Sequence, residues 1–209
     1  MRRYNIINLL IKKYNFKSYL EIGYQNGICY DKIRVRRKNA VDPYPNIKKD
    51  HTLKVMTSDN FFKANIKKYD IIFIDGLHTY EQVKKDFENS LDALSSKGII
   101  VFHDMSPEDT EYNGKIIPGE VRSKSFNEGG KWNGDCYKLA IDMYNGDYDY
   151  YYETVDSDQG CMILYPYKKR EINKDNLEKT YTVLSEKRKE ILNLLSKEEF
   201  EDKMKEINE

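Results

Sequence analysis

Short apolar runs alternate along this chain with longer segments in which apolar residues recur every three or four positions. The short runs are typical of strands buried in a sheet, and the periodic segments are typical of amphipathic helices. In the first half, strands are predicted at 18–23, 40–43, 53–56, 70–74 and 98–102, and helices at 6–14, 61–68 and 79–94. The alternation predicts an α/β fold with a Rossmann-like, doubly wound and mostly parallel sheet.

The pattern changes after the fifth predicted strand. Residues 106–134 are polar and interrupted by proline and glycine, which is typical of a lid or an acceptor-binding loop. A helix is predicted at 136–144. The apolar runs 150–155 and 160–165 then predict an antiparallel pair at the edge of the sheet.

Beyond Pro166 the chain is highly charged and carries one apolar stripe at helical spacing. Ser196 and Glu199 have the spacing of a capping box, which predicts the start of a last short helix. We therefore expect a core domain at 1–166 and a helical C-terminal extension at 167–209. An apolar stripe has to be buried, so the extension would pack on the domain or join copies of the chain in a homo-oligomer.

Charge and composition narrow the classes of partner. Lys and Arg together number 35, as do Asp and Glu, so no net field favours nucleic acid or an anionic membrane. No apolar run approaches about 18 residues, and the first residues lack the apolar core of a signal peptide. The spacing of Cys29, Cys136 and Cys161 matches no zinc site and no disulfide framework. We expect a soluble cytoplasmic protein. The cations at 32–38 are explained either by a solvated face or by an anion-binding patch.

Two neighbouring strands each end in a carboxylate and an imidazole. The fourth predicted strand is followed by Asp75 and then His78, and the fifth leads into His103 and Asp104. Ligands of open α/β sheets bind in the crevice outside the carboxyl ends of the strands. These side chains therefore predict an active site, with His78 as a general base and the two acids as groups that orient it or hold a divalent ion.

The first predicted strand ends in a glycine loop, Glu21-Ile22-Gly23-Tyr24-Gln25-Asn26-Gly27. The loop differs from the Gly-x-Gly-x-x-Gly of dinucleotide folds, because Gln25 stands at the middle glycine. A pyrophosphate needs close backbone approach, whereas a cofactor without phosphate tolerates a looser loop that contains an acid. Asp42 ends the second strand and is placed to accept hydrogen bonds from ribose hydroxyls.

Several of these segments resemble class I S-adenosylmethionine (SAM)-dependent methyltransferases, and among them methyltransferase family 24, the macrocin-O-methyltransferase-like group. The resemblance covers roughly residues 17 to 166, and its most specific part is the pairing of Asp75-to-His78 with His103-Asp104. The motifs that carry it are Tyr19-Leu20-Glu21-Ile22-Gly23, Val41-Asp42-Pro43, Thr57-Ser58-Asp59, Phe73-Ile74-Asp75-Gly76-Leu77-His78, Val101-Phe102-His103-Asp104, Trp132-Asn133-Gly134-Asp135 and Asp156-Ser157-Asp158-Gln159-Gly160.

The resemblance implies a set of cofactor-binding residues, with residues 1–166 as the SAM-binding domain. Glu21 and Gly23 would hold the methionine part of SAM, Asp42 its ribose, and Ser58 with Asp59 its adenine. The loop positions Tyr24 and Gly27 and the strand-end acid Asp75 would complete this set.

The resemblance also implies a magnesium ion, held in metal-dependent relatives by acids that correspond to Asp75 and Asp104. The pattern departs from that of catechol-type relatives at Met105, where they carry a further acid or amide. His103 stands where some macrolide-sugar relatives have an acid, so it is the third candidate ligand.

These features together predict a SAM-dependent O-methyltransferase acting on a hydroxyl of a sugar or glycoconjugate, with a small-molecule or glycan acceptor. An alcohol is a weak nucleophile until a base or a metal removes its proton. Three alternatives stay open: a metal-free methyltransferase of a small molecule, a nicotinamide-dependent oxidoreductase, and a non-catalytic Rossmann-like binding protein.

Overall fold

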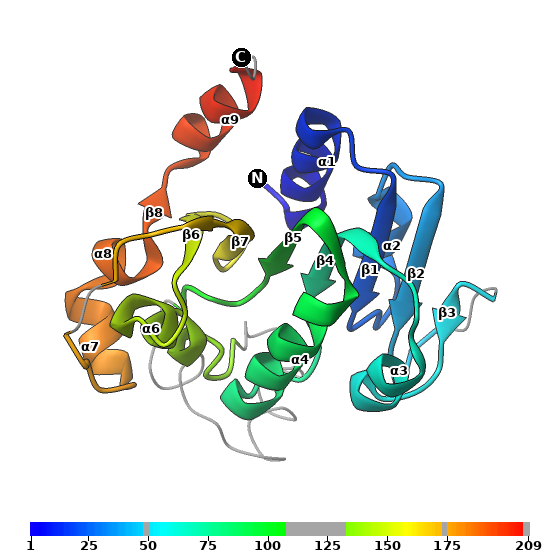
Figure 1. The fold of residues 1–209 in the computed structure, drawn as a ribbon, viewed down its shortest axis with the longest axis horizontal. Coiled ribbons are helices and arrows are strands. Elements are labelled where there is room, and N and C mark those ends of the chain that lie inside the picture. The colour runs from blue at the N-terminus through cyan, green and yellow to red at the C-terminus, as the bar shows by residue number, and fades with distance from the viewer. Residues whose placement is uncertain (48–50, 108–132, 173–174, 207–209) are drawn as a thin grey trace.

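The computed structural model describes residues 1–47, 51–107, 133–172 and 175–206. Within these ranges, eight strands form one mixed sheet in the order β3-β2-β1-β4-β5-β7-β6-β8 (Figure 1). The strands are β1 (Ser18–Ile22), β2 (Arg37–Val41), β3 (Leu53–Lys54), β4 (Tyr69–Ile74), β5 (Leu94–Phe102), β6 (Tyr150–Val155), β7 (Cys161–Lys169) and β8 (Leu194–Leu195). The predicted α/β class, with a Rossmann-like and mostly parallel sheet, is confirmed.

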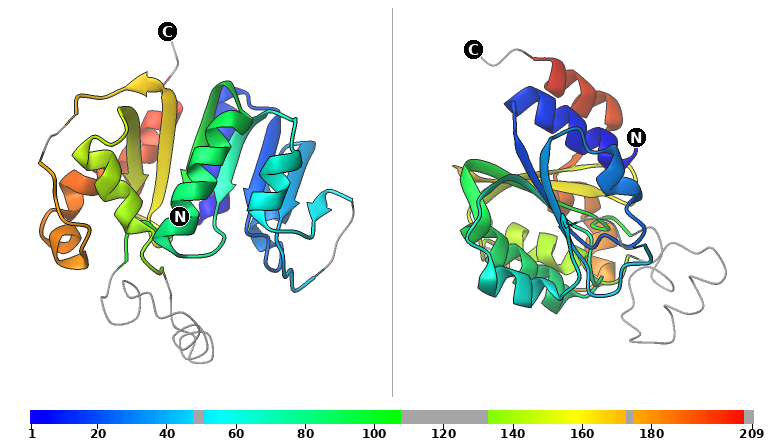
Figure 2. Two further views of the ribbon diagram at one scale, coloured as in Figure 1. Left: turned by 60° about the horizontal axis from the view of Figure 1, so that its bottom comes forward. Right: turned by 90° about the vertical axis from the view of Figure 1, so that its right-hand side faces the viewer.

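Helices cover both faces of this sheet, as the right-hand view of Figure 2 shows. One face packs against α1, α2 and α9 through side chains such as Ile6, Tyr30 and Phe200. The other face packs against α3, α4, α6, α7 and α8. The helices are α1 (Arg3–Tyr14), α2 (Ile28–Lys32), α3 (Ser58–Ala64), α4 (Tyr80–Ala93), α6 (Tyr137–Asn145), α7 (Tyr181–Glu186), α8 (Arg188–Leu192) and α9 (Lys197–Lys205).

The parallel part of the sheet brings the ends of four strands to one edge. β1 pairs in parallel with β2 and with β4, and β4 pairs in parallel with β5. The register places Ile22 beside both Val41 and Ile74, and Ile74 beside Phe102. Because these are the last residues of their strands, the acids and histidines that follow them converge on the same edge.

The antiparallel part begins at β7, which lies between β5 and β6 and runs opposite to both. This agrees with the predicted antiparallel pair. The C-terminal segment was predicted to be helical throughout, but it also contains the short strand β8. β8 pairs in parallel with β6 at the outer edge of the sheet, and Leu184, Ile191 and Leu192 are fully buried. The apolar stripe of the C-terminal segment is therefore buried against the body of the same chain.

Helix boundaries follow local capping chemistry. The helix predicted at 61–68 begins earlier, at Ser58, because the hydroxyl of Thr57 accepts a hydrogen bond from the backbone N–H of Asn60. The helix predicted from Ser196 is present as α9, and both hydrogen bonds of its capping box form. The predicted lid at 106–134 lies almost entirely outside the described residues.

Candidate active site

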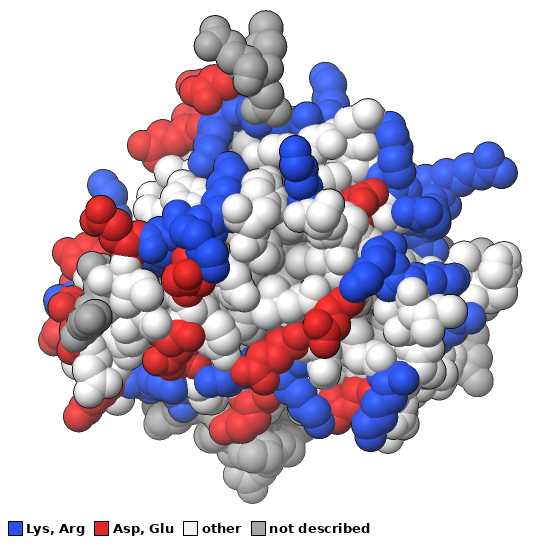
Figure 3. Space-filling view, viewed as in Figure 1, with Lys and Arg blue, Asp and Glu red and all other residues white. Residues whose placement is uncertain are grey.

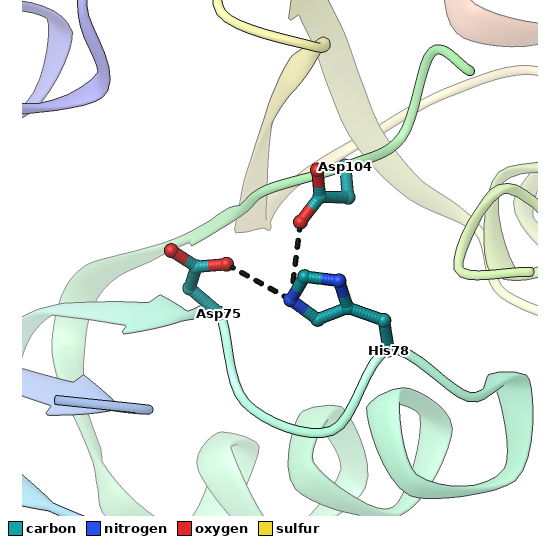
Figure 4. A group of neighbouring side chains, drawn as sticks. All are labelled: Asp75, His78 and Asp104. Carbon is teal, nitrogen blue, oxygen red and sulfur yellow. Dashed lines mark ion pairs between the residues drawn. The ribbon is translucent and has the colours of Figure 1, made fainter. Parts of the chain in front are cut away.

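The acids and the histidine at the ends of β4 and β5 form a compact cluster (Figure 4). The Nε2 atom of His78 lies 3.4 Å from an oxygen of Asp75 and 3.2 Å from an oxygen of Asp104. Asp104 is buried, whereas the side chains of Asp75 and His78 are 14% and 21% exposed. One nitrogen of the imidazole is thus held between two carboxylates on the side that solvent reaches.

One loop from a distant part of the chain fixes the backbone around His78. Gly134 packs so closely that an added Cβ would lie 1.7 Å from the carbonyl oxygen of His78. The next residue, Asp135, donates its N–H to that carbonyl and accepts a hydrogen bond from the N–H of Tyr80. The loop before α6 therefore holds both His78 and the start of α4 in place.

His103 lies behind this pair of acids, away from solvent. Its Nδ1 atom is 2.8 Å from Asp104 and 3.3 Å from Asp75, and its Nε2 atom is 3.7 Å from Asp158. The side chain is 1% exposed. His103 therefore contacts both acids from the buried side, whereas His78 contacts them from the side that is partly exposed to solvent.

Arg3, the first residue of α1, enters the same cluster. Its guanidinium lies 2.6 Å from Asp75 and 3.0 Å from Asp158, and its backbone N–H donates to Asp158. Neither Arg3 nor a role for Asp158 was predicted. Asp158 lay within a motif of the family resemblance, but no local pattern marks Arg3, which is 72 positions from Asp75.

These neighbours explain the electrostatics of the cluster. Burial alone would raise the pKa of Asp75, but the nearby charges of His103 and Arg3 hold it well below its usual range. Burial would lower the pKa of His103, yet the carboxylates of Asp104 and Asp75 raise it well above that of free histidine. The interior of the cluster therefore consists of paired opposite charges.

The glycine loop after β1 lies directly beside the cluster. Gly23 has φ of +93°, and an added Cβ would lie 1.9 Å from the carbonyl oxygen of Asp75. Glu21 is buried at the end of β1, where it accepts a hydrogen bond from the hydroxyl of Tyr19. Burial raises the pKa of Glu21 to about 8.

The rest of this loop is shaped by Tyr24 and Asp42. Gly27, at φ of +73°, is the N-cap of α2 and packs against the hydroxyl end of the buried Tyr24 ring. One oxygen of Asp42 accepts the N–H of Gln25 at 2.7 Å, and the other accepts the N–H of Tyr44 at 2.7 Å. Asp42 thus joins the loops that follow β1 and β2, and its oxygens keep lone pairs for a ligand.

The two residues predicted to hold adenine lie at the start of α3. The side-chain nitrogen of Gln82 donates to Ser58, Asp59 and Asp86, at 3.2, 3.3 and 3.0 Å. Asp59 also pairs with Lys85. Asp86 is buried near Gly76, and burial raises its pKa to about 6. Ser58 and Asp59 are therefore linked by side-chain contacts to α4, the helix that follows β4.

The comparisons with known proteins concern the family and the fold. Residues 20–105 match the model of methyltransferase family 24, described as a methyltransferase domain. This part of the chain is similar to that family. No curated protein matches the chain. Of the functions that the sequence left open, the family match agrees with a methyltransferase and does not agree with a nicotinamide-dependent oxidoreductase.

Many solved structures share the fold, and three of them serve as examples. A protein assigned as a caffeoyl-CoA O-methyltransferase from Staphylococcus aureus is 18% identical, with 78% of this chain and 81% of that chain covered and a TM-score of 0.51. An SAH-bound methyltransferase from Podospora anserina is 16% identical, with 81% and 78% covered and a TM-score of 0.54. An O-methyltransferase from Klebsiella pneumoniae is 12% identical, with 78% and 79% covered and a TM-score of 0.50.

The donor atoms at the ends of β4 and β5 fit a divalent cation. Asp75, His78 and Asp104 each offer one ligand atom, and these atoms lie within 4.8 Å of one another. One oxygen of Asp104 is buried and has no hydrogen-bond partner among the described residues. The sequence suggested His103 as the third ligand, but this geometric set has His78 in that place.

A polar cavity of about 1030 Å³ lies next to the cluster. Arg3 and Asp158 border it on the side of the cluster, and Ser106, Gln159 and Arg188 contribute further polar groups. Arg188 donates hydrogen bonds to the hydroxyl of Ser106 and the carbonyl of Pro107. The cavity thus contains both donors and acceptors at the carboxyl edge of the sheet.

A larger groove of about 1370 Å³ runs along α1 toward α9. Arg34, Arg36 and Arg37 of the predicted basic cluster line it, as do Lys12 and Lys197. In Figure 3, Lys and Arg side chains gather at the upper right, over the region of α1, α2 and β2. The acid–histidine cluster is not part of this groove. Among the described residues, no helix is long and apolar enough to cross a membrane.

Proposed function

We propose that the protein is a SAM-dependent O-methyltransferase acting on a hydroxyl of a sugar or glycoconjugate. The observation that carries the proposal is the position of His78 Nε2, between Asp75 and Asp104 and beside the glycine loop. A base at this edge of the sheet lies next to the place where cofactors of such folds bind.

The cofactor half of the site would be formed by the loops after β1 to β4. SAM, when bound, supplies a methyl group activated by the sulfonium. Glu21 and the Gly23–Gly27 loop would hold its methionine part, Asp42 the ribose hydroxyls, and Ser58 with Asp59 the adenine. This assignment is supported by the joined loops at Asp42, which form one continuous rim from β1 to β2.

The acceptor half depends on His78. Because Nε2 lies against two carboxylates, it would carry the ring hydrogen and donate it to them, so Nδ1 would be the basic nitrogen. A hydroxyl brought close to Nδ1 would give its proton to that atom as the oxygen attacks, which is general-base catalysis. Asp75 and Asp104 would orient the ring and stabilise the imidazolium that forms, because both carboxylates lie within 3.4 Å of the same nitrogen. Alignment of the acceptor supplies the remaining acceleration.

Magnesium would be held by Asp75, His78 and Asp104, and it would lower the pKa of an acceptor hydroxyl. Oxygen ligands suit this ion, which usually keeps several waters. The two forms of the proposal use His78 differently. With a metal, Nε2 would be a ligand; without one, Nε2 would donate its hydrogen to the carboxylates and Nδ1 would be the base.

The class of acceptor is supported by the neighbouring cavity, which Arg3 and Asp158 border and which Asp75, His78 and Asp104 do not line. Its hydroxyl, amide and guanidinium groups match the many hydroxyls of a sugar, and its volume suits a small molecule or one end of a glycan. We place the protein in the cytoplasm and expect no nucleic-acid or membrane partner. The apolar stripe of the C-terminal segment is buried against the same chain, so it does not by itself support a homo-oligomer through these helices.

The test is the formation of S-adenosylhomocysteine from SAM with a panel of free sugars, glycosides and aromatic diols. We expect turnover with a sugar hydroxyl, and loss of that turnover in His78→Ala. Lys67→Ala is the control, because Lys67 is exposed and lies before the start of β4, at the opposite end of that strand from Asp75. Turnover with amine acceptors alone, or full activity in His78→Ala, would contradict the proposal.

A further inference from the structure

Arg3 brings a fixed positive charge into the acid–histidine cluster from the start of α1. Its Nη1 atom lies 2.6 Å from an oxygen of Asp75 and 3.3 Å from Nδ1 of His103. Its Nε atom lies 3.0 Å from Asp158, which also accepts the backbone N–H of Arg3 at 2.8 Å. The guanidinium is therefore held in one orientation by one hydrogen bond to each of two carboxylates, and the backbone N–H adds a second hydrogen bond to Asp158.

The Asp75 carboxylate is shared between this guanidinium and the open side of the site. The oxygen that contacts Arg3 is the one that does not face His78; the second oxygen lies 3.4 Å from His78 Nε2 and 3.3 Å from His103 Nδ1. A guanidinium stays protonated at every pH at which proteins fold. The carboxylate that a divalent ion would use is thus already paired with a permanent cation.

We propose that Arg3 is a built-in counter-cation that opposes divalent-ion binding by Asp75, His78 and Asp104. The inference rests on the site of the proposed function and concerns how that site is controlled. Arg3 stabilises the two acids at close range without a metal, and its charge repels a metal placed on the far side of Asp75. The metal affinity of the protein is therefore set by the N-terminal helix.

Two consequences follow from this arrangement. The cluster keeps its geometry in the absence of metal, because Arg3 holds Asp75 and Asp158 together. A divalent ion binds only weakly, because part of the negative charge that would attract it is already neutralised. Removal of the guanidinium charge would leave Asp75 with more charge for a metal, so affinity would rise.

The experiment measures Mn²⁺ binding to the full chain without SAM, by electron paramagnetic resonance of free Mn²⁺ and by calorimetry. The variants are Arg3→Gln, Arg3→Lys and, as matched control, Arg2→Gln. Arg2 pairs with the other oxygen of Asp158 at 3.2 Å and is 70% exposed, and its recorded ion pair does not include Asp75. We expect Arg3→Gln to bind Mn²⁺ about tenfold tighter or more, since one charge near a partly buried site has an effect of this order.

The controls separate charge from shape. Arg3→Lys keeps the charge and should stay within about threefold of wild type, and Arg2→Gln within about twofold. Unchanged or weaker Mn²⁺ binding in Arg3→Gln would overturn the proposal. If Arg3→Gln does not fold, the double variant Arg3→Gln/Asp158→Asn takes its place, because it also removes the charge of the carboxylate that loses its partner. The same increase in Mn²⁺ affinity is expected for it, and unchanged or weaker binding would again overturn the proposal.

The outcome is independent of the proposed function. Formation of S-adenosylhomocysteine by wild type would support the methyltransferase whatever Mn²⁺ does. Altered Mn²⁺ affinity in a protein that transfers no methyl group would support the role of Arg3 while contradicting the function.

Discussion

Gly23 is the position where the added methyl group of an alanine should push the glycine loop after β1 away from the start of the Asp75–His78 segment. It has φ of +93°, a region that residues with a Cβ rarely adopt. Its N–H donates to the carbonyl of Val41, and the adjacent Asp75 donates its N–H to the carbonyl of Ile22. The change Gly23→Ala would place a Cβ 1.9 Å from the carbonyl oxygen of Asp75 and 2.8 Å from the Cα of Gly76.

The size of the effect follows from two terms. A left-handed conformation costs about 1–2 kcal/mol for an L residue. Inserting an atom into a packed site costs about 1–3 kcal/mol more, and here the clashing atoms are backbone, which cannot turn aside. We expect Gly23→Ala to lower the free energy of unfolding by roughly 2–5 kcal/mol, or the melting temperature by roughly 4–20 °C.

Gly76→Ala is the matched control, because it lies against the same pair of strands. An added Cβ there would have Ile22 Cγ2 at 3.5 Å as its nearest neighbour, which is ordinary van der Waals contact. We expect Gly76→Ala to change stability by less than about 1 kcal/mol. Urea unfolding and SAM calorimetry on both variants provide the test. Equal stability of the two, with equal SAM affinity, would refute the account of this loop.

Three further changes test other parts of the site. His78→Ala should lower the single-turnover rate on the order of 10²–10⁴-fold and leave SAM affinity intact, and a loss of SAM affinity as well would contradict its role as base. Glu21 has a pKa of about 8 in the folded state, above its ordinary value of 4.5, so between these two pH values the folded state keeps a proton that the unfolded state releases. The free energy of unfolding should therefore fall as pH rises from 4.5 to about 8. Glu21→Gln should flatten this decline, as measured by urea unfolding at several pH values. Truncation after Arg170 removes the buried Leu184 and Phe200, so it should give insoluble or unfolded protein; a soluble fragment with native circular dichroism and unchanged assembly would contradict this.

The fold was predictable where a buried element is marked by a continuous run of apolar residues in the sequence. β4 and β5 are continuous apolar runs, and their side chains from Ile71 to Ile74 and from Ile99 to Phe102 are nearly or fully buried. The strand β8 was missed, because two leucines within a charged segment fit a helical stripe as well as an edge strand. Its pairing with β6 is decided by tertiary contacts.

The candidate site was predictable where a motif follows a strand. The sequence placed Asp75, His78 and Asp104 at one edge, and the structure brings them within hydrogen-bonding range. It could not place Arg3 or Asp158, because their contacts span 72 and 155 positions and depend on how α1 and the β6–β7 turn pack. The sequence also could not predict that His103 is buried while His78 is partly exposed, because the burial of His103 depends on neighbours from other elements.

Calorimetry with SAM, S-adenosylhomocysteine and NAD tests the central claim most directly, on wild type and Asp42→Ala. The account predicts that SAM and S-adenosylhomocysteine bind in roughly the micromolar range and that NAD does not. Asp42→Ala should weaken SAM by about 1.5–3 kcal/mol, because a charged acceptor of hydrogen bonds is lost. Absence of SAM binding, or SAM affinity that is unchanged in Asp42→Ala, would contradict the account.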